Sequence, residues 1–309
     1  MLALTSAITV AVLGLKEMPG SERKKVSYIM QTFVKGARLG KYTLAAVISG
    51  VASLVALGTV PALATPTGGF AAFANCPVNN PAVIDCTVAT TSSGEFVVGN
   101  KTVPIKHTIT LQGGLTVNPE TGVVTFVEAT NGETLSKTPQ TVPGGLVGIE
   151  GLGGEVTATS ELAGPASSIV LNTESLLTGT GTALSLPVKL KLGNPFLGNH
   201  CYGGSNAHPI VLNLTTGTTS PPKPNKPISG SPGTTTTEEE GEIIVASGTS
   251  LVNNSFAAPG VEGCGLVPFL VDPLVDLGFG VPAGAGHNTA ILDGTLKLTS
   301  AEAVRAHTP

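Results

Sequence analysis

The sequence of 309 residues contains no tryptophan, and aromatic residues make up only 4% of it. Of its three tyrosines, only Tyr202 lies beyond residue 64. Proteins that recognise glycans commonly stack sugar rings on the amphipathic side chains of Trp or Tyr. The composition therefore argues against a carbohydrate-binding module.

Charged residues are also scarce, at 12% of the chain. Residues 1–64 hold seven of the 16 Lys and Arg but only two of the 20 Asp and Glu, so residues 65–309 carry nine positive and eighteen negative side chains, a net charge of −9. An acidic surface without a basic stripe neutralises phosphates poorly and gains nothing from an anionic membrane. We therefore expect no nucleic-acid partner.

An export signal is predicted near the N-terminus. Three basic residues between positions 35 and 41 precede the uninterrupted apolar stretch Leu44–Gly58. Ala62 and Ala64 then give the small-x-small pattern that a signal peptidase accepts. The sequence thus predicts cleavage after Ala64, transient membrane contact of residues 44–58, and a secreted or cell-surface protein. The alternative is that this stretch stays in place as a membrane anchor.

Residues 1–29 lie before this signal. Their apolar run, Met1–Leu15, is shorter than the ~20 residues that span a bilayer and has no positive flank before it. Met30 would begin an ordinary signal peptide by itself. We expect Met30 to be the true start, with a long, two-part N-terminal extension as the alternative.

All four cysteines lie after the signal, at Cys76, Cys86, Cys201 and Cys264. An even number of cysteines in an exported chain predicts disulfides. Three pairings are possible, and we favour Cys76–Cys86 together with Cys201–Cys264. The first would close a short loop that contains two prolines.

Alternation of apolar and polar residues dominates residues 65–309, most clearly at Val103–Leu111 and Leu184–Leu192. Such alternation places one apolar row on one face of a strand. Further strands are expected at Asp85–Thr91, Gly94–Gly99, Glu155–Leu162, Ser167–Asn172, Ile210–Thr215, Glu242–Ser247 and Thr289–Thr299. A hairpin is expected at Val123–Thr134 around Asn131-Gly132. The predicted fold is an all-β, antiparallel β-sandwich or Greek-key barrel with long Gly/Pro-rich loops.

Residues 65–309 are long enough for one large β-rich domain. The segment 215–241 is rich in Pro and Thr and almost free of apolar residues, so we predict a flexible loop there. If it were instead a linker, residues 242–309 would be a second, marginal domain. The only helix expected is a short one at Ser300–His307, with Ser300 as its N-cap.

Two apolar stretches are broken by Gly and Pro, Gly263–Gly286 and Val142–Gly154. The simpler interpretation is coil that packs over the open end of the sandwich. The alternative is an exposed apolar patch that contacts a protein or a lipid, and 263–286 is the segment we expect to make such a contact.

No catalytic motif is found, and we predict no catalytic, cofactor-binding or metal-binding residue. Ser205 and His208 lie close in sequence, but no acid near them could orient the imidazole. Asp272 and Asp276 could be a glycosidase pair, yet two turn-forming carboxylates are the simpler interpretation. His107 is expected to be a buried core residue.

A zinc site is the alternative use of Cys201, together with His200 and His208. Its Cys-x6-His spacing matches no common zinc pattern, and export favours oxidation of the thiol. We therefore expect no metal ion.

The run after the signal includes Phe73-Ala74-Asn75-Cys76-Pro77, Cys86, Gly94-Glu95-Phe96 and Lys101-Thr102-Val103-Pro104-Ile105. It resembles the start of uncharacterised secreted proteins of actinobacteria over about residues 70–120. The resemblance implies export and no known activity.

Two functions remain open at the level of sequence. The first is a non-enzymatic, secreted or envelope-associated β-domain, structural or binding a partner or lipid through its apolar loops. The second is a secreted hydrolase whose site is assembled from residues distant in sequence. We favour the first, because no catalytic motif supports the second.

Overall fold

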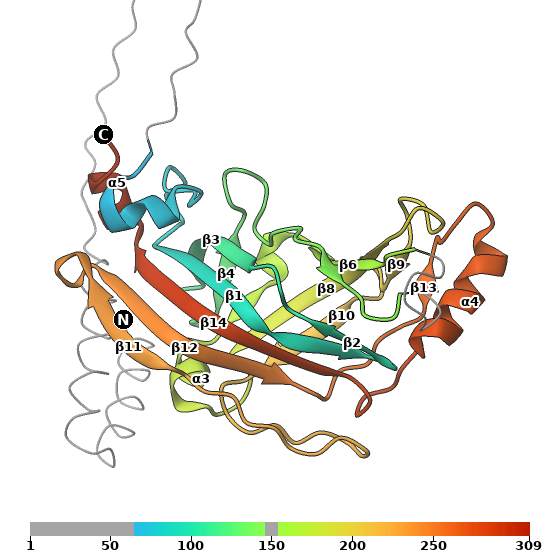
Figure 1. Ribbon diagram of the computed structural model, residues 1–309. Coiled ribbons are helices and arrows are strands. Elements are labelled where there is room, and N and C mark those ends of the chain that lie inside the picture. The colour runs from blue at the N-terminus through green and yellow to red at the C-terminus, as the bar shows by residue number, and fades with distance from the viewer. Residues whose placement is uncertain (1–64, 146–153) are drawn as a thin grey trace, which may run out of the picture. The chain divides into compact units, whose positions relative to one another are not determined.

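The computed structural model describes residues 65–145 and 154–309. Contacts divide the chain into residues 1–63 and the unit Ala64–Pro309, and the following account concerns the second unit. Its described residues form one antiparallel β-sheet of fourteen strands, with short helices near its ends (Figure 1). The predicted all-β antiparallel class is confirmed.

The strands of the described residues are β1 (Asp85–Val98), β2 (Lys101–Pro104), β3 (Ile109–Val117), β4 (Val124–Val127), β5 (Gln140–Thr141), β6 (Thr157–Leu162), β7 (Val170–Leu171), β8 (Leu184–Gly193), β9 (Tyr202–Gly203), β10 (Ile210–Leu214), β11 (Thr234–Glu238), β12 (Ile243–Asn253), β13 (Val261–Glu262) and β14 (Thr289–Ser300). The helices are α3 (Thr173–Thr178), α4 (Pro268–Phe279) and α5 (Ala301–Ala306), with 3-10 turns η2 (Gly68–Phe73), η3 (Ala166–Ser168) and η4 (Glu239–Gly241).

The sheet bends back on itself. Its hydrogen-bonded order is β11-β12-β14-β1-β3-β4-β7-β8-β6-β5, and β10 also pairs with β8. Thr215, directly after β10, exchanges two backbone hydrogen bonds with Val252 of β12, at 3.0 and 2.9 Å. The long strands β1, β12 and β14 therefore face the layer that contains β6, β8 and β10 (Figure 1).

The three longest strands share one bend. Both β1 and β12 contain a bulge opposite the same part of β14, between Thr91 and Ser93 and between Ser247 and Thr249. A Cβ atom at Gly294 of β14 would lie 1.7 Å from the Thr90 carbonyl oxygen, so only glycine allows this approach. The two strands expected above at Asp85–Thr91 and Gly94–Gly99 are therefore one strand, β1, with a bulge between Thr91 and Ser93.

Two groups of buried side chains stabilise the unit. The larger lies between the two layers and includes Leu115, Phe126, Ile169, Leu186 and Leu212. The smaller surrounds one end of β1 and includes Phe70, Phe73, Ile243 and Val304. Burial of apolar surface of this extent is the main stabilising contribution to such a fold.

Both disulfides have the pairing favoured above. Cys76–Cys86 lies within the smaller core, and Cys201–Cys264 joins the segment before β9 to the segment before α4. Among the described residues no cysteine is free. Two disulfides are typical of extracellular proteins.

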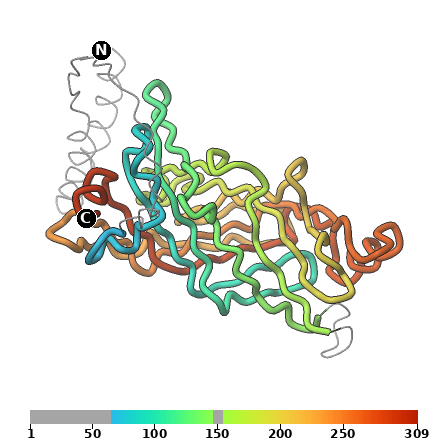
Figure 2. Tube along the Cα trace, turned by 90° about the horizontal axis from the view of Figure 1, so that it is seen from above, coloured from blue at the N-terminus to red at the C-terminus, as the bar shows by residue number. Residues whose placement is uncertain are grey.

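The ends of this unit lie together, away from α4. The Thr67 N–H donates to the His307 carbonyl oxygen at 3.1 Å, and the Phe70 ring stacks on the His307 imidazole with centroids 4.0 Å apart. Helix α5 begins as predicted, since the Ser300 hydroxyl accepts a hydrogen bond from the Ala303 N–H at 3.1 Å. Figure 2 shows η2 and α5 at one end and α4 at the other.

Two local predictions are wrong. The residues around Asn131-Gly132 form a turn but no hairpin, because β4 pairs with β3 and β7 while Leu135 bridges to Leu111. The segment 215–241 is not a loop without regular structure, because Thr234–Glu238 forms β11 and pairs with β12. Threonine favours strands, and an edge strand needs little apolar surface, which explains how so polar a segment joins the sheet.

Candidate binding site at helix α4

Helix α4 lies at the end of the sheet farthest from η2 and α5 (Figures 1 and 2). Pro268 starts it, at a position where the missing N–H leaves no intrahelical bond unmade. Gly280 ends it in the left-handed conformation, with φ of 68°, and donates its N–H to the Asp276 carbonyl oxygen. The interpretation of this segment as coil is therefore wrong, although Pro273 does lie inside the helix.

The two carboxylates of α4 point inward, toward the sheet. Asp272 accepts hydrogen bonds from the backbone N–H groups of Gly263 and Cys264, at 3.2 and 2.8 Å. Asp276 accepts one from the Val261 N–H at 2.7 Å. These bonds hold the helix against β13 and supply acceptors for backbone donors that the sheet leaves unpaired.

The opposite face of α4 is apolar and open to solvent. Leu266, two residues before the helix, is 100% exposed, and Leu277 is 79% exposed. Phe196 is 71% exposed, and the carbonyl of its neighbour Leu197 accepts the Gly265 N–H at 2.8 Å, which brings this loop to the base of α4. We call the following set the apolar tip: Phe196, Leu266, Phe269, Leu270, Leu274 and Leu277.

An ordinary surface helix has an apolar stripe toward the core and a polar outer face. Helix α4 has the apolar stripe, with Val275 and Phe279 buried, but its outer face is apolar as well. The six side chains of the apolar tip are between 58 and 100% exposed. With about 200 Å² for a fully exposed Leu or Phe, they present roughly 900 Å² to solvent. The largest apolar patch on a typical monomer is about 300–600 Å², so the apolar tip is the candidate binding surface of the described residues.

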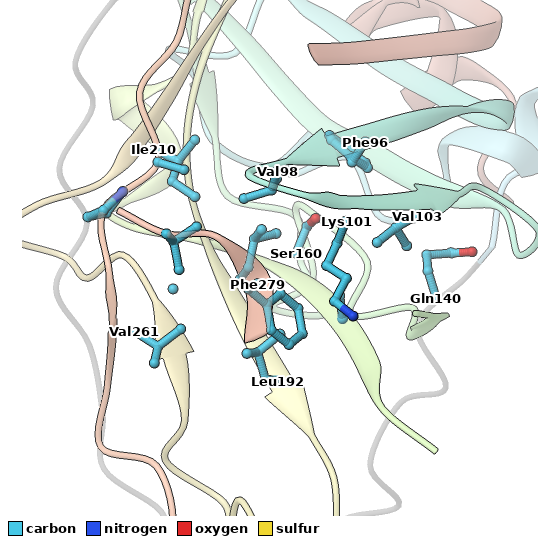
Figure 3. A pocket seen from close by; sticks show the side chains of 16 residues that line it. Phe96, Val98, Lys101, Val103, Gln140, Ser160, Leu192, Ile210, Val261 and Phe279 are labelled. Atoms are coloured by element: carbon cyan, nitrogen blue, oxygen red, sulfur yellow. The ribbon is translucent and has the colours of Figure 1, made fainter. Parts of the chain in front are cut away.

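A small apolar cavity lies beneath the same end of the molecule (Figure 3). Its volume is about 40 Å³, and its walls come from β1, β2, β6, β8, β10 and the C-terminal end of α4. Phe279, the last residue of α4, lies on one side of the cavity beside Leu192, and Val98 of β1 lies on the other side.

Lys101 is the one charged residue among those lining this cavity. It is only 8% exposed, and its Nζ donates to the Gly145 carbonyl oxygen at 3.0 Å. The same Nζ lies 5.5 Å from the centroid of the Phe279 ring, a cation–π contact. Within residues 65–145 and 154–309, no carboxylate oxygen lies within 4.0 Å of it.

The residues considered for catalysis have structural contacts. Ser205 and His208 form a turn in which the Ser205 hydroxyl accepts the His208 backbone N–H at 3.2 Å. This hydrogen bond joins the hydroxyl to the backbone of His208 and not to its imidazole. Asp272 and Asp276 bind backbone N–H groups, as described above.

His107 is exposed, so the prediction of a core histidine is wrong. Strand β2 ends at Pro104 and β3 begins only at Ile109, and the residues between them form a connection rather than a continuous strand. The side chain of Gln140 stabilises this connection by accepting the backbone N–H groups of Lys106 and His107, at 2.9 and 3.0 Å.

Cys201 is in a disulfide, so it is not a thiolate ligand for a metal with His200 and His208. In the part of the chain that the structure describes, no group of three or more His, Cys, Asp or Glu is arranged to hold a metal ion. The same residues include no helix that is both long enough and apolar enough to cross a membrane.

The predicted cleavage site at Ala62 and Ala64, the apolar stretch 44–58 and the start at Met30 lie outside the described residues. So does most of the second apolar stretch, at 146–153. Comparisons with protein-family models, with curated proteins and with solved structures find no match for this chain.

Five of the six exposed side chains of the apolar tip lie in the segment 263–286, and its contact with a protein or lipid stays a prediction. The sequence analysis missed the helix and the cavity. The exposed residues at 266, 269, 270, 274 and 277 recur at helical spacing, and Pro268 and Gly280 are ordinary helix boundary signals. Lys101 carried no such signal, because its burial depends on strands that are distant in sequence.

Proposed function

We propose that this protein is an exported, non-enzymatic β-domain that attaches to a lipid surface through the apolar tip on α4. The observation that supports the proposal is the orientation of the helix. Its carboxylates bind backbone N–H groups on the inner side, and four large apolar side chains, Phe269, Leu270, Leu274 and Leu277, are left facing solvent. That arrangement is unfavourable in water and becomes favourable once an apolar phase covers the tip.

A lipid surface fits the chemistry of the tip better than a protein does. Protein interfaces have polar rims, and their binding hot spots are enriched in Trp, Tyr and Arg, none of which the tip contains. Between Leu266 and Phe279 the only ionisable side chains are Asp272 and Asp276, and both face the sheet. Hydrocarbon requires no hydrogen-bonding partner from the side chains that enter it.

The shape of this end also suits a lipid surface. The helix has 12 residues, so it is about 18 Å long, and it lies at the end of the unit (Figure 1). A helix of this kind can lie in the plane of the interface with its apolar face about 5–10 Å deep.

The charge of the protein sets which lipid surface it prefers. Residues 65–309 carry a net charge of −9, and the tip has no Lys or Arg of its own. Electrostatic attraction to anionic headgroups is therefore absent, and we expect attachment to uncharged or zwitterionic lipid that is insensitive to salt.

Sedimentation with phosphatidylcholine vesicles tests the proposal. We would compare protein recovered from an exporting host with the double variant Leu274→Ser/Leu277→Ser. The matched control is Leu177→Ser/Val211→Ser, which removes two exposed apolar side chains from α3 and β10. Because the N-terminus is the same in all three proteins, a difference between them isolates the tip.

Each leucine of the tip is worth about 1.5 kcal/mol of transfer free energy at its present exposure, so the tip variant should lose about 100-fold in partition coefficient. The control should bind the vesicles like the wild type, and 0.5 M NaCl should not change the partition coefficient of either protein. Equal binding of all three proteins would refute the proposal. Wild-type dimerisation without lipid that disappears in the tip variant would assign the surface to a second copy of this chain instead.

A further inference from the structure

The cavity beneath α4 contains a feature that lipid attachment does not use, a buried ammonium group in apolar surroundings. Lys101 has three N–H donors on Nζ, and one of them reaches the Gly145 carbonyl oxygen. The Phe279 ring lies at its side, and no carboxylate of the described residues is within 4.0 Å. A buried charge is unfavourable unless an opposite charge and hydrogen bonds accompany it.

The remaining polar groups of the cavity are few. The side-chain amide of Gln140 is engaged elsewhere, because its oxygen accepts two backbone N–H groups and its nitrogen donates to the His107 carbonyl oxygen. Ser160, on β6, faces the same cavity and offers a hydroxyl donor (Figure 3). The other side chains that line the cavity are apolar, among them Val98, Val261 and Phe279.

We propose that this cavity binds a short-chain aliphatic carboxylate. The carboxylate group accepts a hydrogen bond from Lys101 Nζ, and the hydrocarbon tail contacts Val98, Val261 and Phe279. A single negative charge matches the single cation. A phosphate with two charges would leave one of them buried without a partner.

The size of the cavity limits the tail. A cavity needs about 10–15 Å³ to hold one water molecule, so the observed volume of about 40 Å³ admits only a few heavy atoms. Longer chains require displacement of α4, because Phe279 at its end forms a wall. Affinity should therefore rise from acetate to butyrate and stop rising, or fall, at octanoate.

The proposal does not depend on lipid attachment, so it is tested in the absence of vesicles. Isothermal titration calorimetry would measure binding of acetate, butyrate, hexanoate and octanoate, with 1-butanol and butylammonium as uncharged and cationic analogues of butyrate. We expect the wild type to bind butyrate at least tenfold more tightly than 1-butanol, and not to bind butylammonium.

The decisive variant is Lys101→Met, which keeps an unbranched side chain of similar length and removes the cation. It should bind butyrate at least tenfold more weakly than the wild type while its affinity for 1-butanol does not fall. The matched control is Lys106→Met, which removes the same charge from an exposed position in the connection after β2. That variant should bind butyrate as the wild type does.

An equal loss of affinity for butyrate in Lys101→Met and Lys106→Met would mean that the anion responds to the total charge of the protein and not to Lys101 in the cavity. This result would overturn the assignment. Equal affinities of the wild type for butyrate and butylammonium would overturn it as well. The second comparison needs no variant, so the proposal remains testable even if Lys101→Met does not fold.

Discussion

The replacement Asp85→Asn should stabilise the protein at neutral pH and have little effect in acid. Asp85 begins β1 between Leu115 of β3 and Ser300 of β14. Alternation along the strand puts its side chain on the same face as Thr87 and Ala89, and Thr87 is buried. Removal of the carboxylate from water raises the pKa of Asp85 from 3.8 to about 6.

The sign and size follow from the protons bound in each state. The folded protein holds the Asp85 proton more tightly than the unfolded chain, so folding is favoured below pH 4. This stabilisation is lost as the pH rises from about 4 to about 6. A rise in pKa from 3.8 to about 6 corresponds to a loss of up to about 3 kcal/mol above pH 6. Asparagine is never charged, so the Asp85→Asn variant avoids that loss.

Thermal unfolding of the wild type and of the Asp85→Asn variant at pH 4.0 and pH 7.5 measures the effect. For a unit of this size 1 kcal/mol is about 2–4 °C, so the variant should melt up to about 10 °C higher at pH 7.5 and within about 2 °C at pH 4.0. The control Asp293→Asn removes the same charge from β14. A gain at pH 7.5 that persists unchanged at pH 4.0, or a variant less stable at pH 7.5, would refute the reasoning.

Two further changes test the fold. The side chain of Asn288 is fully buried, accepts the Gly99 N–H and donates to the carbonyl oxygens of Phe256, Ala283 and Gly284. The variant Asn288→Ala should therefore lower the free energy of unfolding by about 3 kcal/mol in a denaturant titration. The control Asn213→Ala, at an exposed position, should lower it by under about 1 kcal/mol. Replacing residues 221–237 by a short Gly-Ser linker should lower the melting temperature by several degrees, because it removes most of β11 and exposes the edge of β12. An unchanged melting temperature would mean that β11 contributes nothing to stability.

The strands with strict alternation could be predicted almost to the residue. Leu184–Leu192 was expected and β8 runs from Leu184 to Gly193, because its apolar row faces the main core throughout. The prediction failed where a strand changes direction without ending. The Ser-Ser-Gly sequence before Glu95 has the composition of a turn, and only the close approach of Gly294 to β1 turns it into a bulge.

The binding end shows a different limit. The apolar character of residues 263–286 is visible in the sequence, but whether such residues are covered depends on what packs against them. Asp272 and Asp276 could not be assigned to backbone N–H groups before β13 was known to lie beside α4. Lys101 likewise looks like an ordinary strand residue until β6, β8 and α4 enclose it.

The position of α4 also bears on the N-terminal signal. The chain enters the described unit beside His307, and α4 lies at the opposite end (Figure 2). Only six residues lie between Gly58 and Thr65, a span of at most about 25 Å, so an uncleaved anchor at residues 44–58 would be tied to the end of the described unit that is distant from α4. Cleavage after Ala64 removes this constraint and leaves the apolar tip free to meet a lipid surface. The proposed attachment is therefore expected of the cleaved protein, and the mass of the protein recovered with the vesicles should begin at Thr65.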